Sequence, residues 1–104
     1  ARSGLHGLSK ALSREVAQYN ITINNVLPER INTDRQTQIL NFQAKLASSS
    51  YEEARKELEE SLTAKRMGTV EEFAGICTFL CSEQAAYISG QNISVDGGNS
   101  TNLI

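Results

Sequence analysis

Only a few side chains in this sequence have the types and spacing that catalysis or metal binding requires. His6 is the only histidine, so neither a histidine metal cluster nor a triad drawing on several histidines can be assembled. Cys77 and Cys81 lie four residues apart on the apolar side of a predicted helix, but no further ligand is spaced to complete a zinc site. We therefore predict two buried core thiols and no bound metal.

The composition indicates one ordinary globular domain. The chain has 104 residues, of which 39% are hydrophobic and 21% charged, close to average usage. The net charge is −2 and no block of Lys and Arg is present, which argues against nucleic-acid binding. The apolar runs are far shorter than the roughly 20 residues that span a bilayer. Two cysteines without a secretory signal favour a reducing compartment, so we expect a cytoplasmic protein.

Hydrophobic spacing predicts two strands and about four helices. The strands are 21–27, rich in β-branched residues and ended by Pro28, and 92–96, ended by two glycines. The helices are expected at about 3–18 with Asn20 as a stop, from Thr33 or Asp34 to about 46, after Ser50, and after Thr69. Ser50 and Thr69 each precede a glutamate by three residues, which is the pattern of a capping box.

Two strands of this kind do not make a viable core by themselves. The long segment between them contains only predicted helices, so the strands would pair in parallel. Parallel sheets are buried on both faces and need further strands beside them. The pattern therefore predicts an α/β fold that corresponds to the later part of an open, doubly wound sheet.

Four motifs, in order and at similar spacing, resemble those of the short-chain dehydrogenases/reductases. Residues 2–12 (RSGLHGLSKAL) resemble the family helix that follows its catalytic tyrosine. Residues 20–33 (NITINNVLPERINT) are similar to the strand and loop N-I-x-V-N-x-V-x-P-G-x-I-x-T. Residues 66–74 (RMGTVEEFA) and 87–98 (YISGQNISVDGG) are similar to R-x-G-x-P-E-E-I-A and Y-I-T-G-Q-x-I-x-V-D-G-G. Together the motifs resemble the C-terminal portion of a 3-oxoacyl-carrier-protein reductase-like member.

The resemblance implies a Rossmann-type doubly wound parallel sheet whose N-terminal half is absent from these residues. The family's glycine-rich phosphate loop, T-G-x-x-x-G-x-G, and its catalytic tyrosine have no counterpart here, and Ala1 falls inside the family motif Y-x-x-x-K. We therefore expect residues 1–104 to be a partial NAD(P)-binding Rossmann domain. Residues 34–65 match the family's variable substrate loop, a helical lid over the active site.

Three positions match the family loop that contacts the nicotinamide and its carboxamide: Pro28, Ile31 and Thr33. Pro28 ends a strand at its carboxyl edge, where ligands bind in open α/β sheets. A backbone N–H near Ile31 and the Thr33 hydroxyl are suited to the carboxamide. Thr33 is equally suited to cap the helix that follows, and the two roles are compatible.

Two residues in the expected site depart from the family pattern. Arg2 stands where the family has a catalytic lysine, which binds the nicotinamide ribose and lowers the pKa of the tyrosine. A guanidinium keeps the positive charge but not the shape of an ammonium, so Arg2 is either a cofactor-side residue or a solvated one. Glu29 stands where the family usually has glycine, and its carboxylate would crowd the cofactor pocket or repel phosphates. The parent is then an atypical reductase, or a member with weak or lost activity.

The resemblance implies hydride transfer between NAD or NADP and a small carbonyl or alcohol substrate. The 104 residues contain neither the phosphate loop nor the proton donor, so we expect them to be inactive alone. A homo-oligomer, dimer or tetramer, is expected through the helix containing Gly4 and Gly7, and through the helix after Thr69 with the strand at Ile93. The alternative is a non-catalytic, oligomerising interaction module or a degenerate family remnant. Substrate identity and the choice between NAD and NADP stay open.

Overall fold

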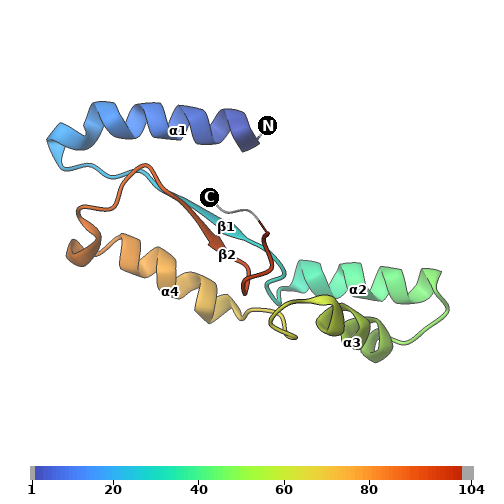
Figure 1. Ribbon diagram of the computed structural model, residues 1–104. Helices are drawn as coiled ribbons and strands as arrows, with labels where there is room; N and C mark the ends of the chain where they lie inside the picture. The colour runs from blue at the N-terminus through green and yellow to red at the C-terminus, as the bar shows by residue number, and fades with distance from the viewer. Residues whose placement is uncertain (1, 102–104) are drawn as a thin grey trace. The chain divides into compact units, whose positions relative to one another are not determined.

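The computed structural model describes the backbone of residues 2–101 and the side chains of residues 4–101 (Figure 1). The predicted four helices and two strands are all present in the described residues. In chain order they are α1 (Arg2–Val16), β1 (Asn25–Pro28), α2 (Asp34–Leu46), α3 (Tyr51–Ser61), α4 (Val70–Leu80) and β2 (Asn92–Val95), with short 3₁₀ helices at Ala17–Tyr19 and Glu83–Ala85. The chain forms two compact units, residues 1–27 with 74–95, and residues 28–73 with 96–104.

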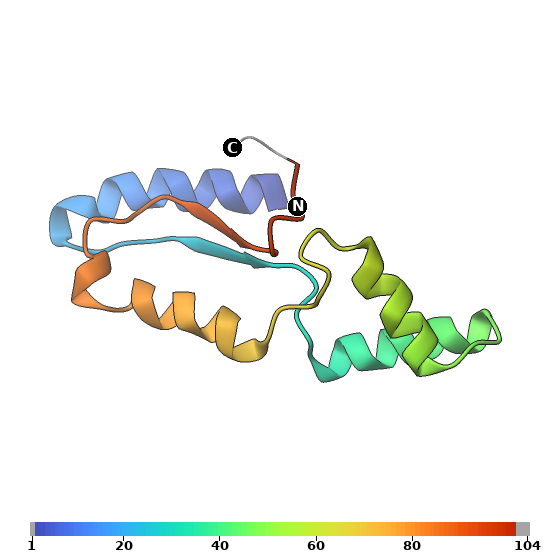
Figure 2. The same ribbon diagram turned by 60° about the horizontal axis from the view of Figure 1, so that its bottom comes forward.

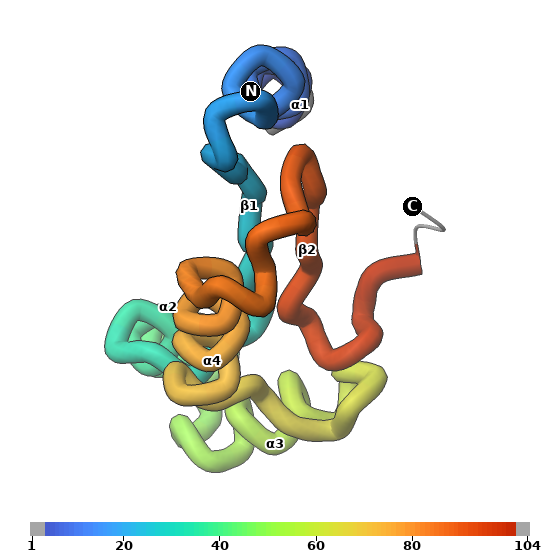
Figure 3. Tube along the Cα trace, turned by 90° about the vertical axis from the view of Figure 1, so that its left-hand side faces the viewer, coloured from blue at the N-terminus to red at the C-terminus, as the bar shows by residue number. Residues whose placement is uncertain are grey.

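The first unit is built around the two strands, which pair in parallel as predicted. Figures 1 and 2 show α1 and α4 on opposite sides of the strand pair, and Figure 3 shows the same arrangement from one end of the strands. The N–H of Asn25 donates to the carbonyl of Gln91 at 2.9 Å where the pairing begins. A crossover that returns a strand in parallel through a helix is the unit from which doubly wound sheets are built.

The first strand is shorter than predicted. Residues 21–24 are outside β1, which begins at Asn25. Ile23 and Asn24 bond to the segment before β2 partly through side chains: the N–H of Ile23 donates to Ser89 Oγ at 3.1 Å, and Asn24 Nδ2 donates to the carbonyl of Ile88 at 3.0 Å. Side-chain partners therefore replace regular ladder bonds, a choice that β-branched composition alone does not reveal.

The first helix also ends earlier than predicted. Its last two predicted residues belong to the 3₁₀ turn Ala17–Tyr19 instead. Asn20 then takes a left-handed conformation with φ 60°, and its N–H donates to the carbonyl of Ala17 at 3.1 Å. Asn20 is thus the stop that the sequence indicates, because asparagine tolerates this conformation better than most residues.

The prediction of two buried thiols is wrong for Cys81, which is exposed, and Cys77 is only half-buried. Cys81 follows the last residue of α4 and lies in the turn that leaves the helix, where its N–H donates to the carbonyl of Thr78 at 3.1 Å. Cys81 therefore does not share the apolar face of α4 with Cys77, because the helix ends before it.

The second unit has a small core of its own between α2 and α3. Leu40, Leu62 and Met67 are buried there, with three partly buried residues packed against them: Tyr51, Ala54 and Leu58. Leu40 is 1% exposed and is the largest fully buried side chain in the described part of the chain. Burying a leucine of this kind stabilises a fold by roughly 2 kcal/mol.

The predicted helix starts are confirmed at the level of individual hydrogen bonds. Ser50 Oγ accepts from the N–H of Glu53 at 3.2 Å. At the start of α4 the exchange is reciprocal, because Thr69 Oγ1 accepts from the N–H of Glu72 at 3.1 Å and the carboxylate of Glu72 accepts from the N–H of Thr69 at 2.9 Å. Each bond satisfies an N–H that has no partner inside its helix.

The apolar stripe of α1 is largely uncovered in the first unit. Leu5, Leu8 and Leu12 are 56%, 65% and 44% exposed. A Cβ added at Gly4 or Gly7 would meet no neighbouring atom within 4 Å.

Among the described residues, no helix is both long enough and apolar enough to cross a membrane.

Candidate functional site

The predicted cofactor loop, residues 28–33, is held in place by backbone hydrogen bonds to Gly68. The N–H of Asn32 donates to the carbonyl of Gly68 at 2.8 Å, and the N–H of Gly68 donates to the carbonyl of Arg30 at 3.0 Å. A Cβ on residue 68 would come within 2.9 Å of Ile31 Cδ1. A side chain at position 68 would therefore have to displace the end of the Ile31 side chain.

These bonds leave the amide and carbonyl of Ile31 on the other edge of the loop. Neither group of Ile31 makes a hydrogen bond within the described part of the chain. Parallel pairing explains this, because the residue at the centre of a parallel bridge is bonded through its two neighbours. A backbone donor and acceptor are thus available at the position that the sequence predicts for contact with a carboxamide.

A cavity of about 340 Å³ opens beside this loop. It brings together three of the four predicted cofactor residues, and Glu29 is not among the residues that line it. Its walls are mostly apolar, and the lining residues are Pro28, Arg30, Ile31, Thr33, Arg35, Gln36, Val70 and Phe73. An apolar cavity with a few polar groups is the usual form of a small-molecule site.

Thr33 caps α2 as predicted and keeps a donor free. Its Oγ1 accepts from the N–H of Gln36 at 3.3 Å. A hydroxyl that accepts a hydrogen bond still has its own proton to donate, and Thr33 donates that proton to no other described residue. The structure therefore permits capping and ligand binding by Thr33 at the same time.

Glu29 points to a different partner from the one that the sequence suggests. Its Oε1 accepts from Asn99 Nδ2 at 3.1 Å. The other amide atom of that side chain, Asn99 Oδ1, accepts from both the N–H and the hydroxyl of Thr63, at 3.3 and 3.2 Å. Asn99 therefore joins the cofactor loop to the segment that follows α3, an arrangement we call the Asn99 clasp (Glu29, Thr63 and Asn99).

The turn after β2 places Asn99 for this role. Gly97 and Gly98 have φ of 61° and 78°, which glycine adopts readily. The carboxylate of Asp96 accepts from the N–H of Gly98 at 3.1 Å and from the N–H of Ser100 at 2.9 Å. The two glycines and Asp96, predicted only to end a strand, thus also orient the residue that follows them.

An exposed ion pair supports the segment between Gly68 and α4. Arg66 binds the carboxylate of Glu72 through two bonds of 2.7 and 2.8 Å. The Arg66 guanidinium, followed by the N–H of Thr69, lowers the pKa of Glu72 to about 2. Glu72 therefore stays ionised, and keeps the capping box intact, at any pH near neutrality.

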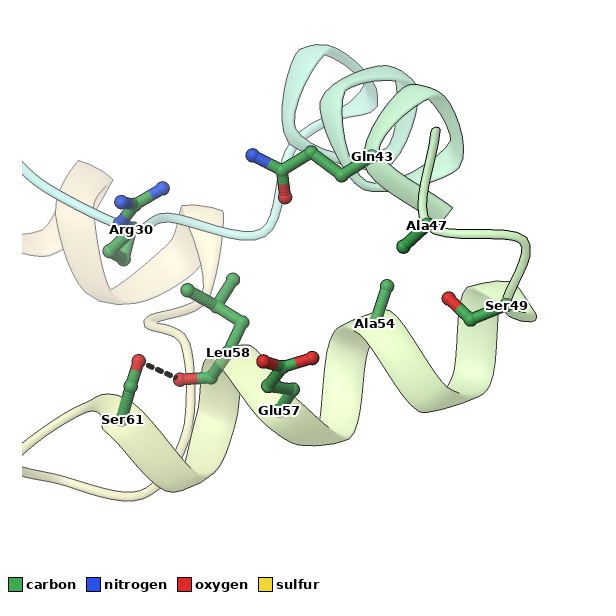
Figure 4. A pocket seen from close by; sticks show the side chains of 8 residues that line it. All are labelled: Arg30, Gln43, Ala47, Ser49, Ala54, Glu57, Leu58 and Ser61. Atoms are coloured by element: carbon green, nitrogen blue, oxygen red, sulfur yellow. Dashed lines mark hydrogen bonds between the residues drawn. The ribbon is translucent and has the colours of Figure 1, made fainter. Parts of the chain in front are cut away.

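The predicted lid region contains a second cavity of about 370 Å³ between α2 and α3. Figure 4 shows the methyl groups of Ala47 and Ala54 facing each other across it, with Gln43 of α2 and Arg30 of the loop 28–33 farther along. The hydroxyl of Ser61 is already bonded to the carbonyl of Leu58 at 2.6 Å (Figure 4). Arg30 is the one residue that lines both cavities.

The side chain of Arg2, the predicted counterpart of the family lysine, lies outside the residues whose side chains are described. Within the described residues, no three or more His, Cys, Asp or Glu side chains gather closely enough to hold a metal ion. The candidate site therefore rests on the loop 28–33, the start of α2 and the start of α4.

Comparison with known proteins places the chain in a family. A family model described as enoyl-(acyl carrier protein) reductase matches residues 1–100. The chain belongs to the short-chain dehydrogenase/reductase family. The resemblance predicted from the four motifs is thereby confirmed, and so is the fold class, since the solved relatives have the Rossmann-type fold.

Individual relatives match over only part of their own length. The NADPH-dependent reductase BacG of Bacillus subtilis is 40% identical over 93% of this chain and 38% of its own length. Dehydrogenase/reductase SDR family member 4 of Sus scrofa is 40% identical over 99% of this chain and 34% of its own. The chain thus spans little more than a third of these curated relatives.

Solved structures agree with this fold. The NADPH-dependent reductase YwfH, involved in bacilysin biosynthesis, superposes with a TM-score of 0.86 at 37% identity, covering 97% of this chain and 38% of that one. The L-sorbose reductase of Gluconobacter frateurii, complexed with NADPH and L-sorbose, superposes with a TM-score of 0.87 at 31% identity over 97% of this chain and 39% of that one.

Sequence reasoning did not single out several polar residues of this region, among them Arg30, Arg35, Gln36 and Asn99. Arg30 and Arg35 lie within or next to the recognised loop motif, so two cations close to predicted ligand-binding residues were a readable signal. Asn99 follows the glycine pair directly, but nothing in the sequence relates it to Glu29, from which 70 positions separate it.

Proposed function

We propose that these residues supply the nicotinamide side and the substrate lid of an NAD(P)-dependent oxidoreductase. Such an enzyme transfers a hydride between the cofactor and a small carbonyl or alcohol substrate. In the reducing direction the carbonyl carbon accepts the hydride and the carbonyl oxygen accepts a proton. The glycine-rich loop and the tyrosine that the family uses are not among these 104 residues, so we propose that this chain alone does not turn over substrate.

The observation that carries this proposal is the set of unused hydrogen-bonding groups at the loop 28–33. The backbone groups of Ile31 and the hydroxyl proton of Thr33 have no partner in the described part of the chain, and Ile31 and Thr33 line the 340 Å³ cavity. These groups fit an amide such as the nicotinamide carboxamide, which needs a donor and an acceptor side by side. Ile31, Thr33 and Pro28 would hold that ring, and the cofactor would supply the hydride.

The family departure at Glu29 does not block this fit. Its carboxylate is bonded to Asn99, and Glu29 does not line the cavity. We propose that the lid, 34–65, closes over the substrate and excludes water from the reaction. The relatives named NADPH-dependent support NADP as the first cofactor to test.

The test begins with the coding DNA upstream of Ala1. We expect it to encode a glycine-rich loop, and a tyrosine four residues before Arg2. The protein from the full reading frame is then mixed with NADPH and a panel of carbonyl compounds, and loss of NADPH absorbance is followed. Carbonyl-dependent oxidation supports the proposal, whereas a reading frame that starts here, or a protein that binds neither NADPH nor NADH, overturns it.

A second candidate function is an oligomerising interaction module in the cytoplasm. The exposed leucines of α1, and the open space beside Gly4 and Gly7, favour it. Contiguous apolar surface of this kind commonly marks an interface. A protein that forms dimers or tetramers in light scattering, yet binds no nicotinamide nucleotide, would favour this function over the first.

A further inference from the structure

The cavity beside the cofactor loop has an unbalanced charge. Two of its lining residues, Arg30 and Arg35, are cationic, and none of its lining residues is acidic. Neither guanidinium forms an ion pair or a hydrogen bond with any described residue. Elsewhere in the described chain, Arg55 and Arg66 are paired with glutamates, and Arg14 has no ion pair. The two unpaired arginines therefore share a cavity that contains no internal counter-charge.

The backbone of Arg30 is held in a conformation that nothing in its side chain favours. Its φ is 57°, in the left-handed region that residues with a side chain rarely adopt. The hydrogen bond from the N–H of Gly68 to its carbonyl keeps it there. Unusual backbone conformations are retained mainly where the surrounding structure enforces them, and they cluster at functional sites. The base of the Arg30 side chain is thus fixed beside both cavities.

Two further features add donors on the same side. The cavity lies at the start of α2, where Thr33 is the cap and Arg35 and Gln36 are in the first turn. Helix starts favour negative charge because their N–H groups point outward. Gln36 is 91% buried, and its Nε2 has no hydrogen-bond partner in the described part of the chain. A buried amide donor without a partner is costly unless a ligand satisfies it.

We propose that Arg30 and Arg35 bind an oxyanion, a carboxylate or a phosphate, carried by the ligand that enters this cavity. The inference rests on the proposed function and adds to it a chemical class: one of the two ligands presents its negative charge here. Arginine suits this role because its planar guanidinium can make two parallel bonds to such a group. The oxyanion is carried either by the substrate, as a 2-oxo acid carries it, or by the cofactor, in its phosphates.

The test uses the protein from the full reading frame with R30Q, R35Q and K45Q. The control K45Q removes one positive charge from the last turn of the same helix, away from the cavity. Steady-state rates are measured with a 2-oxo acid and with its methyl ester, which lacks the charge, and NADPH affinity is measured by fluorescence. Losing a charged hydrogen bond should weaken binding about tenfold.

If the substrate carries the oxyanion, R30Q and R35Q raise KM for the acid about tenfold and leave KM for the ester and the Kd of NADPH unchanged. If the cofactor carries it, the same variants raise the Kd of NADPH and affect acid and ester alike. Either result supports the proposal. If R30Q and R35Q match K45Q in every measurement, the proposed anion site is overturned. The proposed function still stands in that case if the wild type reduces a carbonyl compound.

A second measurement keeps the two proposals separable. Inorganic phosphate is titrated into the wild type while the guanidinium Nε–H signals of Arg30 and Arg35 are followed by NMR. Saturable shifts that R30Q abolishes support the anion site even in a protein that reduces no carbonyl, and only the proposed function then fails. Shifts that stay linear to high phosphate contradict the anion site.

Discussion

The two helical regions on either side of the cofactor loop treat their apolar residues in opposite ways. In the region 34–67, which contains the predicted lid, Leu40, Leu62 and Met67 form a buried hydrophobic cluster. In α1, the side chains of Leu5, Leu8 and Leu12 are 44–65% exposed. Helical periodicity looks the same in both sequences, because it reports that a face is apolar and not what covers it. The region 34–67 therefore has a buried cluster among its own residues, whereas the leucines of α1 stay largely exposed.

The largest expected effect is on the lid core. We expect L40A to lower the free energy of unfolding by about 3 kcal/mol, because it opens a cavity at a site that is 1% exposed. The neighbouring variant I39A, at a position 37% exposed, should cost under about 1 kcal/mol. Chemical denaturation of both proteins measures the difference. Equal losses would mean that α2 and α3 have no core of their own.

The opposite result is expected in α1. We predict that L8Q, at a side chain 65% exposed, changes the stability of the monomer by under about 0.5 kcal/mol. If α1 is an interface, the same variant weakens self-association, which sedimentation velocity measures over a range of concentrations. An unchanged association with unchanged stability would contradict the interpretation of α1 as an interface.

The Asn99 clasp joins the cofactor loop to the end of the lid, so it tests whether the two act together. N99D removes the donor to Glu29 and sets two carboxylates against each other, and we expect about a fivefold rise in KM with little change in kcat. In the double variant E29Q/N99D, the new amide at position 29 can donate to the new carboxylate at position 99. Recovery of KM in the double variant supports the clasp, and additive losses would rule it out.

The smallest effect concerns the Arg66–Glu72 pair. The pKa of Glu72 is lowered from its ordinary value of 4.5 to about 2 in the folded protein. Its contribution to stability is therefore complete above pH 4.5 and is lost as the pH falls toward about 2. We expect E72Q to reduce the thermal stability slightly at neutral pH and to flatten its fall between pH 5 and 2 relative to the wild type. An unchanged acid profile in E72Q would mean that other carboxylates dominate.

Features that depend on residues close together in the sequence could be predicted, and features that depend on contacts between distant residues could not. The caps at Thr33, Ser50 and Thr69 were readable because the groups that bond lie three residues apart. The end of the first helix at Asn20 was readable for the same reason. The start of β1 was not, because Ile23 and Asn24 bond to a side chain and a carbonyl more than 60 positions away.

The candidate site divides along the same line. Pro28, Ile31 and Thr33 were predicted from a motif, and they do line one cavity. Glu29 was expected to disturb that cavity, but its carboxylate bonds to Asn99, a residue at the other end of the chain. The unpaired state of Arg30 and Arg35 could not be predicted either, because it depends on which acidic side chains the fold places near them.

The most direct test of the account is the affinity for NADPH of T33V, measured by fluorescence on the protein from the full reading frame. The central claim is that Thr33 both caps α2 and donates to the cofactor. S50A removes the corresponding cap from α3, and T33S keeps both roles of the hydroxyl. We predict that T33V raises the Kd about fivefold, while T33S and S50A leave it near the wild-type value. Equal Kd values for T33V and S50A would contradict the claim.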